Sequence, residues 1–293
     1  MEELQKEIEE NSRNVFGNHH ISEQSNEQLY KRKFDRINYE YLELPEGWFK
    51  GKKALDAASG TALSNTHKLL ELGAEVTSLD LPGDHEFDES RIKDKFKGKY
   101  KLMRGNILAL PFEDNTFDYV HCEGALHHTI HPKKGFMELA RVTKPGGYLY
   151  VTAFGTPGIF REVEDFLREK YKKGQDFQKL IDTLTEEKLQ AVIKWINANL
   201  KEDHPPIPLE LFDQDLVVTI KDRLQAPIYT RHSTTEVLSW YKEAVFKTAK
   251  RITRYPKGCK NMRRYMSPIY EQWNHPLSKF INGDGFIQVI GQK

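Results

Sequence analysis

The sequence lacks several features that would assign it to other classes of protein. It has no apolar run near the roughly 20 residues that a membrane-spanning helix needs. The N-terminal stretch MEELQKEIEE has neither the basic nor the apolar region of a signal peptide. Its two cysteines, Cys122 and Cys259, show no motif spacing, which favours a reducing compartment. We therefore expect a cytoplasmic protein that is not embedded in a membrane.

The sequence also lacks an excess of charge of one sign, with 44 Lys and Arg against 43 Asp and Glu. Nucleic-acid-binding domains are usually basic overall, so we expect no nucleic acid partner. One stretch departs from this balance, because residues 246–270 contain basic side chains and no acid. This pattern favours either an anionic small-molecule partner, bound by residues such as Arg263 and Arg264, or a sheet edge protected by its charges. The histidine pairs 19–20 and 127–128 lack metal-ligand spacing, and no metal is expected.

The glycine-rich fingerprint G-x-G-x-x-G of dinucleotide-binding proteins is absent too. In its place, residues 53–57 and 74–79 have the pattern of two buried strands joined by a helix over 63–72. Asp56 and Asp80 fall near the ends of these strands, which open into one crevice in a right-handed βαβ unit. We expect the carboxylate of Asp80 to accept hydrogen bonds from both hydroxyls of a ribose.

The turn between the first strand and the helix contains one glycine, Gly60, beside the small residues Ser59 and Thr61. A single glycine lets a ligand approach the backbone but does not form the nest that a pyrophosphate requires. A ligand with adenosine and no phosphate fits better, and S-adenosylmethionine is the common one. Its sulfonium is positive, so an acid such as Asp56 favours binding. A nucleotide-dependent oxidoreductase is disfavoured by the single glycine.

The chain resembles the class I S-adenosylmethionine-dependent methyltransferases, among them the quinone-biosynthesis and small-molecule enzymes. LDAASGTA resembles their first motif, L-D-x-G-C-G-T-G, and VTSLD at 76–80 resembles the second. Later elements follow in order: GNILALPF at 105–112, FDYV at 117–120, LHH at 126–128 and RVTKPGG at 141–147. The resemblance covers about residues 49–154. It implies a cofactor site formed by Asp56, Ser59, Gly60, Asp80, Leu81, Asn106, Ile107 and Glu123.

Four residues in or next to this site depart from the family pattern. Ser59 and Ala62 replace Cys or Gly and Gly, respectively, which we expect to tighten packing and retain binding. Asn106 replaces the aspartate that accepts a bond from the adenine amino group, and its side-chain carbonyl can accept the same bond. Glu123 stands where many relatives carry a neutral residue. It is a second candidate base, or a partner for a cationic substrate.

The expected fold is α/β: a Rossmann-like, seven-stranded, mostly parallel sheet with helices on both faces. The expected strands are 53–57, 74–79, 100–104, 117–122, 148–153, 246–255 and 285–291, with a turn at 144–147 before the fifth and one loop between the last two. Capping-box spacing at 233–236 predicts a helix over 237–243. The resemblance implies that the last strand is antiparallel, beside the sixth.

We expect an N-terminal helical lid at 1–44, an S-adenosylmethionine-binding core at 45–154, a helical substrate cap at 155–230, inserted after strand five, and C-terminal completion of the sheet at 231–293. The N-terminal helices either lie over the cofactor cleft or cover a sheet edge, and both alternatives stay open. If they form a lid, Tyr30, Phe34 and His20 are candidates for the site.

Catalysis in this family needs little covalent help, because methyl transfer from a sulfonium is an in-line displacement. A base is required only if the acceptor must lose a proton. His128, after the fourth strand, is the preferred base, and a structural role in bracing its loop is the alternative. His127, Tyr229, Arg231 and His232 are candidate substrate contacts.

The sequence therefore predicts a cytoplasmic methyltransferase that uses S-adenosylmethionine and a small-molecule acceptor, with an anionic compound as one alternative. Oxygen or nitrogen is favoured over carbon as the acceptor atom. The alternative is a non-catalytic S-adenosylmethionine-binding sensor or scaffold. Neither the identity of the acceptor nor the oligomeric state follows from the sequence.

Overall fold

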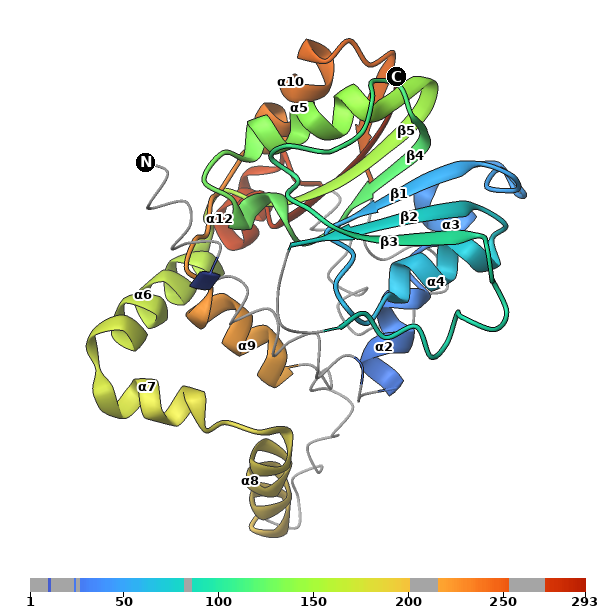
Figure 1. Cartoon of the computed structure of the whole chain (residues 1–293). Coiled ribbons are helices and arrows are strands. Elements are labelled where there is room, and N and C mark those ends of the chain that lie inside the picture. The colour runs from blue at the N-terminus through green and yellow to red at the C-terminus, as the bar shows by residue number, and fades with distance from the viewer. Residues whose placement is uncertain (1–9, 12–23, 25–26, 82–85, 201–215, 253–271) are drawn as a thin grey trace.

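A computed structural model of the chain describes all residues except 1–9, 12–23, 25–26, 82–85, 201–215 and 253–271. A seven-stranded sheet runs through the centre, in the order β3-β2-β1-β4-β5-β7-β6 (Figure 1). Its strands are β1 Lys53–Ala57, β2 Glu75–Asp80, β3 Tyr100–Arg104, β4 Phe117–Cys122, β5 Thr143–Phe154, β6 Thr248–Arg251 and β7 Phe286–Gln292.

The first five strands are parallel, and β7 runs antiparallel between β5 and β6. The fold class predicted from the sequence is confirmed, including the antiparallel last strand. The strand order reverses between β1 and β4, and ligands of open α/β sheets bind at such a reversal, outside the carboxyl ends of the strands. The loops after β1 and β4 therefore mark the expected binding region.

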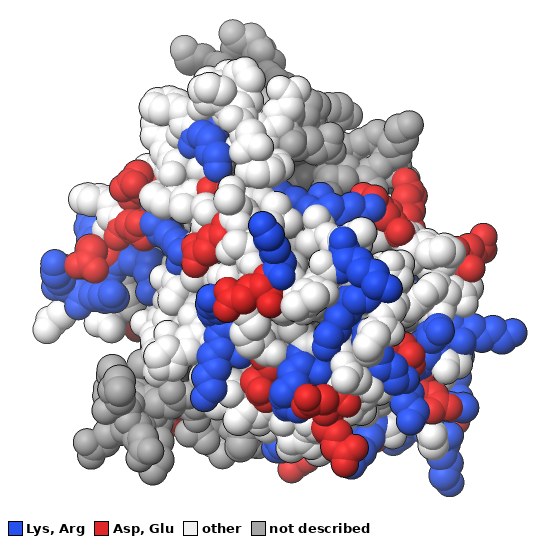
Figure 2. Space-filling model, turned by 90° about the horizontal axis from the view of Figure 1, so that it is seen from above, with Lys and Arg blue, Asp and Glu red and all other residues white. Residues whose placement is uncertain are grey.

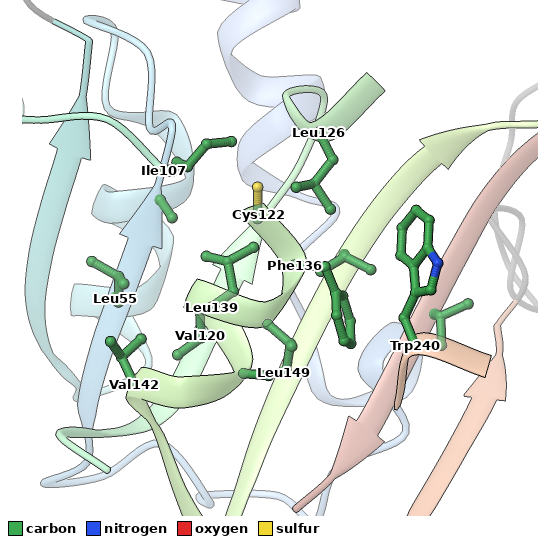
Figure 3. Close-up of a cluster of buried hydrophobic side chains, with 14 of the residues drawn as sticks. Leu55, Ile107, Val120, Cys122, Leu126, Phe136, Leu139, Val142, Leu149 and Trp240 are labelled. Carbon is green, nitrogen blue, oxygen red and sulfur yellow. The ribbon is translucent and has the colours of Figure 1, made fainter. Parts of the chain in front are cut away.

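Helices cover both faces of the sheet, and each face has its own apolar core. On one face, α5 (Pro132–Val142) and α10 (Thr234–Glu243) pack on β1, β4, β5 and β7. Figure 3 shows Phe136 and Leu139 of α5 against the strand residues Val120 and Leu149, with Trp240 of α10 beside them. On the other face, α3 (Tyr39–Leu42) and α4 (Ser64–Glu71) bury a second cluster of apolar side chains.

The local sequence accounts for where these helices begin. Pro132 occupies the first turn of α5, where its missing N–H costs nothing. Ser233 caps α10 by accepting a hydrogen bond from the backbone N–H of Glu236 at 3.0 Å. The capping-box spacing in the sequence predicted this start correctly, although the carboxylate of Glu236 bonds to the side chain of His232 rather than back to the cap.

The chain after β5 forms the helical insertion that the sequence predicts. Its described helices are α6 (Ile159–Lys173), α7 (Gln175–Asp182), α8 (Glu186–Ala198) and α9 (Leu216–Gln225). They extend away from the sheet, with α8 farthest from it (Figure 1). The return segment, residues 226–232, lies along the end of β5, where the backbone N–H of His232 donates to Phe154 O at 2.9 Å. The insertion thus starts and ends at the carboxyl end of β5.

Three details of the predicted elements differ from the structure. The fifth strand begins at Thr143 rather than Tyr148, because Phe117 pairs with Thr143 before the register shifts. The expected turn at 144–147 is thus a distortion within the strand, with Gly146 at φ 80°. The sixth strand spans residues 248–251, a shorter range than the predicted 246–255. A helix that the sequence analysis missed, α12 (Pro276–Asn282), precedes β7.

No helix of the described residues is both long and apolar enough to cross a membrane. The described residues also contain no group of three or more His, Cys, Asp or Glu side chains that could hold a metal ion. On the face seen in Figure 2, basic and acidic side chains are interspersed, without a large area of one sign.

Candidate functional site

The turn after β1 forms the floor of the candidate site. The N–H groups of Ala58 and Ser59 both donate to Leu79 O of β2, at 2.7 and 3.1 Å, which ties the turn to the neighbouring strand. Gly60 has φ 66°, a conformation that favours glycine. Ala58 also has a positive φ, 60°, where the family pattern carries a glycine. Ala58 is a further departure that the sequence analysis missed. The left-handed backbone conformation costs an alanine roughly 1–2 kcal/mol.

The carboxylate of Asp80, at the end of β2, reaches over this turn. One of its oxygens accepts a hydrogen bond from the backbone N–H of Gly60 at 2.7 Å. Its backbone carbonyl accepts from Gly105 N at 2.8 Å, which links the end of β2 to the loop after β3. Hydrogen bonds therefore join the strand end, the glycine turn and the loop carrying Asn106 in one place.

Asp56, in β1, is a buried acid with an incomplete set of partners. Its side chain is 1% exposed, and Oδ2 accepts from Thr66 Oγ1 at 2.7 Å. Its other oxygen, Oδ1, has no hydrogen-bond partner among the described residues. Burial raises the pKa of Asp56 to about 6; His121 and the Thr66 hydroxyl oppose this rise, and the charges of Asp80 and Glu123 add to it.

Glu123 follows β4 and pairs with a residue far away in the sequence. Arg36 Nη1 donates to Glu123 Oε1 at 2.8 Å, and the Glu123 side chain is only 10% exposed. The other oxygen, Oε2, lies 3.7 Å from Nε2 of the buried His121 in β4. Asp56, Asp80 and Glu123 thus bring three carboxylates to neighbouring strand ends near the switch point, the place between β1 and β4 where the strand order reverses.

The segment that contains α2 (Glu27–Phe34) contacts this region directly. Gln24 donates to the Thr61 hydroxyl in the turn at 3.0 Å, and the Tyr30 hydroxyl lies 2.8 Å from His67 Nδ1 in α4. The Phe34 ring lies 4.9 Å from that of His67. Together with the Arg36–Glu123 pair, these contacts place the described N-terminal residues next to the turn. His20, the third candidate, lies outside the described residues.

The remaining predicted cofactor residues lie in the loops after β2 and β3. Asn106 Oδ1 accepts a hydrogen bond from Leu108 N at 2.9 Å, so its carbonyl shapes its own loop. Ile107 is buried in the core cluster, and the Leu81 carbonyl accepts from Arg104 Nη1 at 3.1 Å. Ser59 is buried, and its hydroxyl donates to Gly60 O at 3.1 Å.

The two histidines after β4 lie in a short 3₁₀ helix, η1 (Leu126–His128), and brace the return segment of the insertion. His128 Nδ1 donates to the carbonyl of Ile228 at 3.0 Å, since a carbonyl can only accept. The backbone carbonyl of His127 accepts from Thr230 N at 2.8 Å. Burial, reinforced by the nearby charges of His128, Arg161 and His232, holds the pKa of His127 well below its usual range. The side chain of His127 is therefore neutral.

The hydrogen bond of His128 also defines its tautomer. With the proton on Nδ1, a neutral imidazole has its lone pair on Nε2. Bracing and base catalysis are therefore compatible at His128, because they use different nitrogens.

The candidate substrate residues in the return segment gather around Tyr229. Its ring stacks on Phe154 with centroids 4.3 Å apart, and its hydroxyl accepts a hydrogen bond from Arg161. Arg231 forms a bidentate ion pair with Asp165 of α6. His232 Nδ1 lies 2.9 Å from Glu236 Oε1. These groups hold the insertion against the end of β5; Arg263 and Arg264 lie outside the described residues.

Sequence analysis missed two residues that complete the site, Arg36 and His121. Arg36 lies 87 positions before its partner Glu123, and no local pattern marks such a contact. The signal for His121 was a histidine in the middle of an apolar strand, a position where a polar side chain needs partners.

Residues 55–151 match the family model described as a methyltransferase domain. This match and the mostly parallel seven-stranded sheet identify the core of the chain as a methyltransferase domain of the class I type.

Among curated proteins, the chain is 35% identical over 119 residues to demethylmenaquinone methyltransferase of Renibacterium salmoninarum, covering 40% of this chain and 48% of that protein. It is 36% identical over 114 residues to the protein of the same name from Geobacillus kaustophilus, covering 38% and 49%, respectively. The matches therefore span about half the length of these relatives.

Among solved structures, PKMT2 from Rickettsia typhi in complex with AdoHcy is similar with a TM-score of 0.54. The similarity covers 89% of this chain and 52% of that one, at 16% identity, and supports the fold alone.

Proposed function

We propose that this protein transfers a methyl group from S-adenosylmethionine to an oxygen or nitrogen atom of a small molecule in the cytoplasm. The observation that carries the proposal is the convergence of Asp56, Asp80 and Glu123 on a turn with a single glycine. This arrangement suits a nucleoside with a positive group and is poorly suited to a pyrophosphate, which needs positive and N–H-rich surroundings. The methyltransferase domain at 55–151 supports the same cofactor.

Each part of the cofactor has residues suited to hold it. Asp80 would accept hydrogen bonds from the two ribose hydroxyls, and Asn106 would accept from the adenine amino group. Asp56 and Glu123 would attract the positively charged methionine end. The unpartnered Oδ1 of Asp56 fits this role, because a buried acceptor without a protein partner gains most from a ligand donor or a water. The cofactor supplies the activated methyl group.

The protein's contribution to the reaction is to orient the acceptor and exclude water. The N-terminal residues, held by Arg36 and Tyr30, would form the lid, and the insertion would form a wall on the side of β5. His128 would remove a proton from the acceptor through Nε2, while Nδ1 holds the ring to Ile228. The bond at Nδ1 fixes the ring, which favours a productive geometry.

The relatives support one class of acceptor. Their name, demethylmenaquinone methyltransferase, describes a quinone-type substrate for those proteins. A planar, quinone-like acceptor would suit the aromatic rings of Phe154, Tyr229 and His128 near the end of β5.

Calorimetry with S-adenosylmethionine, S-adenosylhomocysteine and NAD tests the cofactor. We expect the two adenosyl ligands to bind and compete with each other, and NAD not to bind in their site. NAD binding that neither adenosyl ligand displaces, without adenosyl binding, would overturn the proposal. A second arm incubates the protein with methyl-labelled cofactor and metabolite extract. Cofactor binding with no labelled product and no S-adenosylhomocysteine formed would favour a sensor or scaffold.

A further inference from the structure

His121 is a buried histidine that the proposed chemistry does not use. It lies in the middle of the sheet, and its ring stacks on Tyr150 of β5 with centroids 4.6 Å apart and an interplanar angle of 13°. Nδ1 lies 3.0 Å from the Tyr119 hydroxyl, and Nε2 forms no hydrogen bond with any described residue. A histidine buried at such cost calls for a physical reason.

The neighbours of the two ring nitrogens indicate which nitrogen carries the hydrogen. Burial raises the pKa of Tyr119 well above its ordinary value, so that its hydroxyl keeps its proton. The hydroxyl can therefore donate to Nδ1, and the carboxylate oxygen facing Nε2 favours the ring form that carries its hydrogen on Nε2. Nε2 lies 3.7 Å from Glu123 Oε2, so its N–H attracts one oxygen of the carboxylate whose other oxygen binds Arg36.

His121 also lies beside the second acid of the site. It is the register partner of Asp56 on the adjacent parallel strand. It is therefore adjacent to both Asp56 and Glu123, the two acids that the proposed function places at the positive end of the cofactor. Glu123 in turn holds Arg36, which directly precedes the buried Ile37 and α3.

We infer that His121 is a positioning residue that orients Glu123 so that the carboxylate can hold Arg36, and with it the N-terminal segment, over the site. Three contacts in series hold the segment. The Tyr119 hydroxyl fixes the His121 ring, Nε2 orients the Glu123 carboxylate, and that carboxylate binds Arg36. Only the effect on cofactor affinity rests on the proposed function; the effect on the N-terminal segment does not require it.

Two substitutions of His121 distinguish the roles of its two ring nitrogens. The amide of His121→Asn reaches the position of Nδ1 and removes Nε2, while the longer His121→Gln places an amide nitrogen near Nε2. Hydrogen–deuterium exchange of the amides at 37–42, measured without cofactor, reports how firmly the segment is held. We expect exchange about fivefold faster in His121→Asn and near the wild-type rate in His121→Gln.

Arg36→Ala supplies the matched comparison, because it removes the last link directly. We expect about tenfold faster exchange in Arg36→Ala, and no further increase in the double variant Arg36→Ala/His121→Asn, since both changes act through Glu123. If His121→Asn does not fold, His121→Phe, which keeps the ring stacked on Tyr150, takes its place with the same expected increase.

Wild-type exchange in His121→Asn, equal acceleration by the Asn and Gln variants, or additive effects in the double variant would each overturn the inference. A separate titration with S-adenosylhomocysteine should show about threefold to tenfold weaker binding in His121→Asn, with affinity restored in His121→Gln. Unchanged affinity in His121→Asn would remove the link from His121 to the cofactor acids. If the wild-type protein binds no adenosyl ligand, the proposed function fails, and the exchange rates still decide the role of His121.

Discussion

The two sides of the switch region use their charged residues in different ways. On the side of β1, Asp56 is 1% exposed, has one oxygen without a described partner and has a pKa raised to about 6. On the side of the insertion, Arg161 and Arg231 are engaged by neighbouring protein groups: Arg161 by Glu164 at 2.5 Å, and Arg231 by Asp165. The first side holds a charge at a cost in stability, whereas the second uses its charges to join helices.

This difference assigns different roles to the two sides. A buried acid that is difficult to ionise is characteristic of a functional site, because folding alone does not require it. A bidentate arginine–carboxylate pair is typical of structural contacts, since its fixed geometry specifies orientation. We therefore propose that the acids at the ends of β1, β2 and β4 bind the ligand, and that the ion pairs around Tyr229 attach the insertion.

The largest expected effect is on turnover, at the point where the two sides meet. His128→Asn retains a group that can donate to Ile228 O but removes the basic Nε2. If His128 is the general base, turnover should fall about 10²–10⁴-fold with unchanged cofactor affinity, and the acidic limb of the pH–rate profile should disappear. Joint loss of cofactor affinity and thermal stability, with the acidic limb retained, would make His128 a brace only. Nearly intact turnover would mean that the acceptor needs no base.

The next largest effect concerns Asp80. Asp80→Ala should weaken cofactor binding by about 2–4 kcal/mol, because the ribose hydroxyls lose a charged acceptor in a partly dry cleft. Glu75→Ala is the matched control: it removes an acid from the opposite end of β2, where Glu75 pairs with Lys99 at 3.0 Å. Calorimetry should show wild-type affinity in this control. Equal affinities in the two folded variants would place the ribose elsewhere.

Asp56 should show the stability cost of its buried charge. Its pKa is raised from 3.8 to about 6, so the folded state binds the proton more tightly than the unfolded state. Its contribution to stability is therefore greatest below about pH 4 and is lost as the pH rises through about 6, amounting to roughly 3 kcal/mol. Asp56→Asn should raise the free energy of unfolding at pH 8, by about 1–3 kcal/mol, and change it little at pH 4. Urea unfolding at the two pH values measures this; equal effects at both would contradict it.

The smallest effect is expected on the side of the insertion. Arg231→Met removes the pair with Asp165, which is partly exposed, so the loss of stability should be about 1 kcal/mol or less. Cofactor affinity should stay at the wild-type value. A tenfold loss of cofactor affinity would show that the charges of the insertion also belong to the cofactor site, and the contrast between the two sides would fail.

The buried parallel strands were the easiest part of the fold to predict. The ranges of β1, β3 and β4 match the prediction, because buried parallel strands are short apolar runs bounded by turn residues. The extension of β5 to Thr143 depends on pairing with Phe117, which the local sequence does not indicate. α12 was missed despite Pro276 at its start, because the preceding basic stretch was interpreted as one loop.

The residues of the candidate site also fall into two groups, those that local spacing predicts and those that depend on distant contacts. Asp56, Gly60 and Asp80 lie within one βαβ unit, so spacing along the chain was sufficient to find them. Arg36 reaches Glu123 from a distant part of the sequence, and the bond from His128 to Ile228 spans 100 residues. Such contacts depend on tertiary packing, and no periodicity or motif in the sequence encodes them.

The most direct test of the account is the pH dependence of S-adenosylmethionine affinity in the wild type and in Asp56→Asn. A cation binds the ionised form of Asp56, whose pKa is about 6 without ligand. Calorimetry from pH 5 to pH 8 should therefore show wild-type affinity rising with pH through about 6, by at most tenfold per unit, and levelling off above 7. Asp56→Asn should bind more weakly at pH 8 and show a nearly flat profile. The same rise in both proteins would contradict the account, because the titrating group would then not be Asp56.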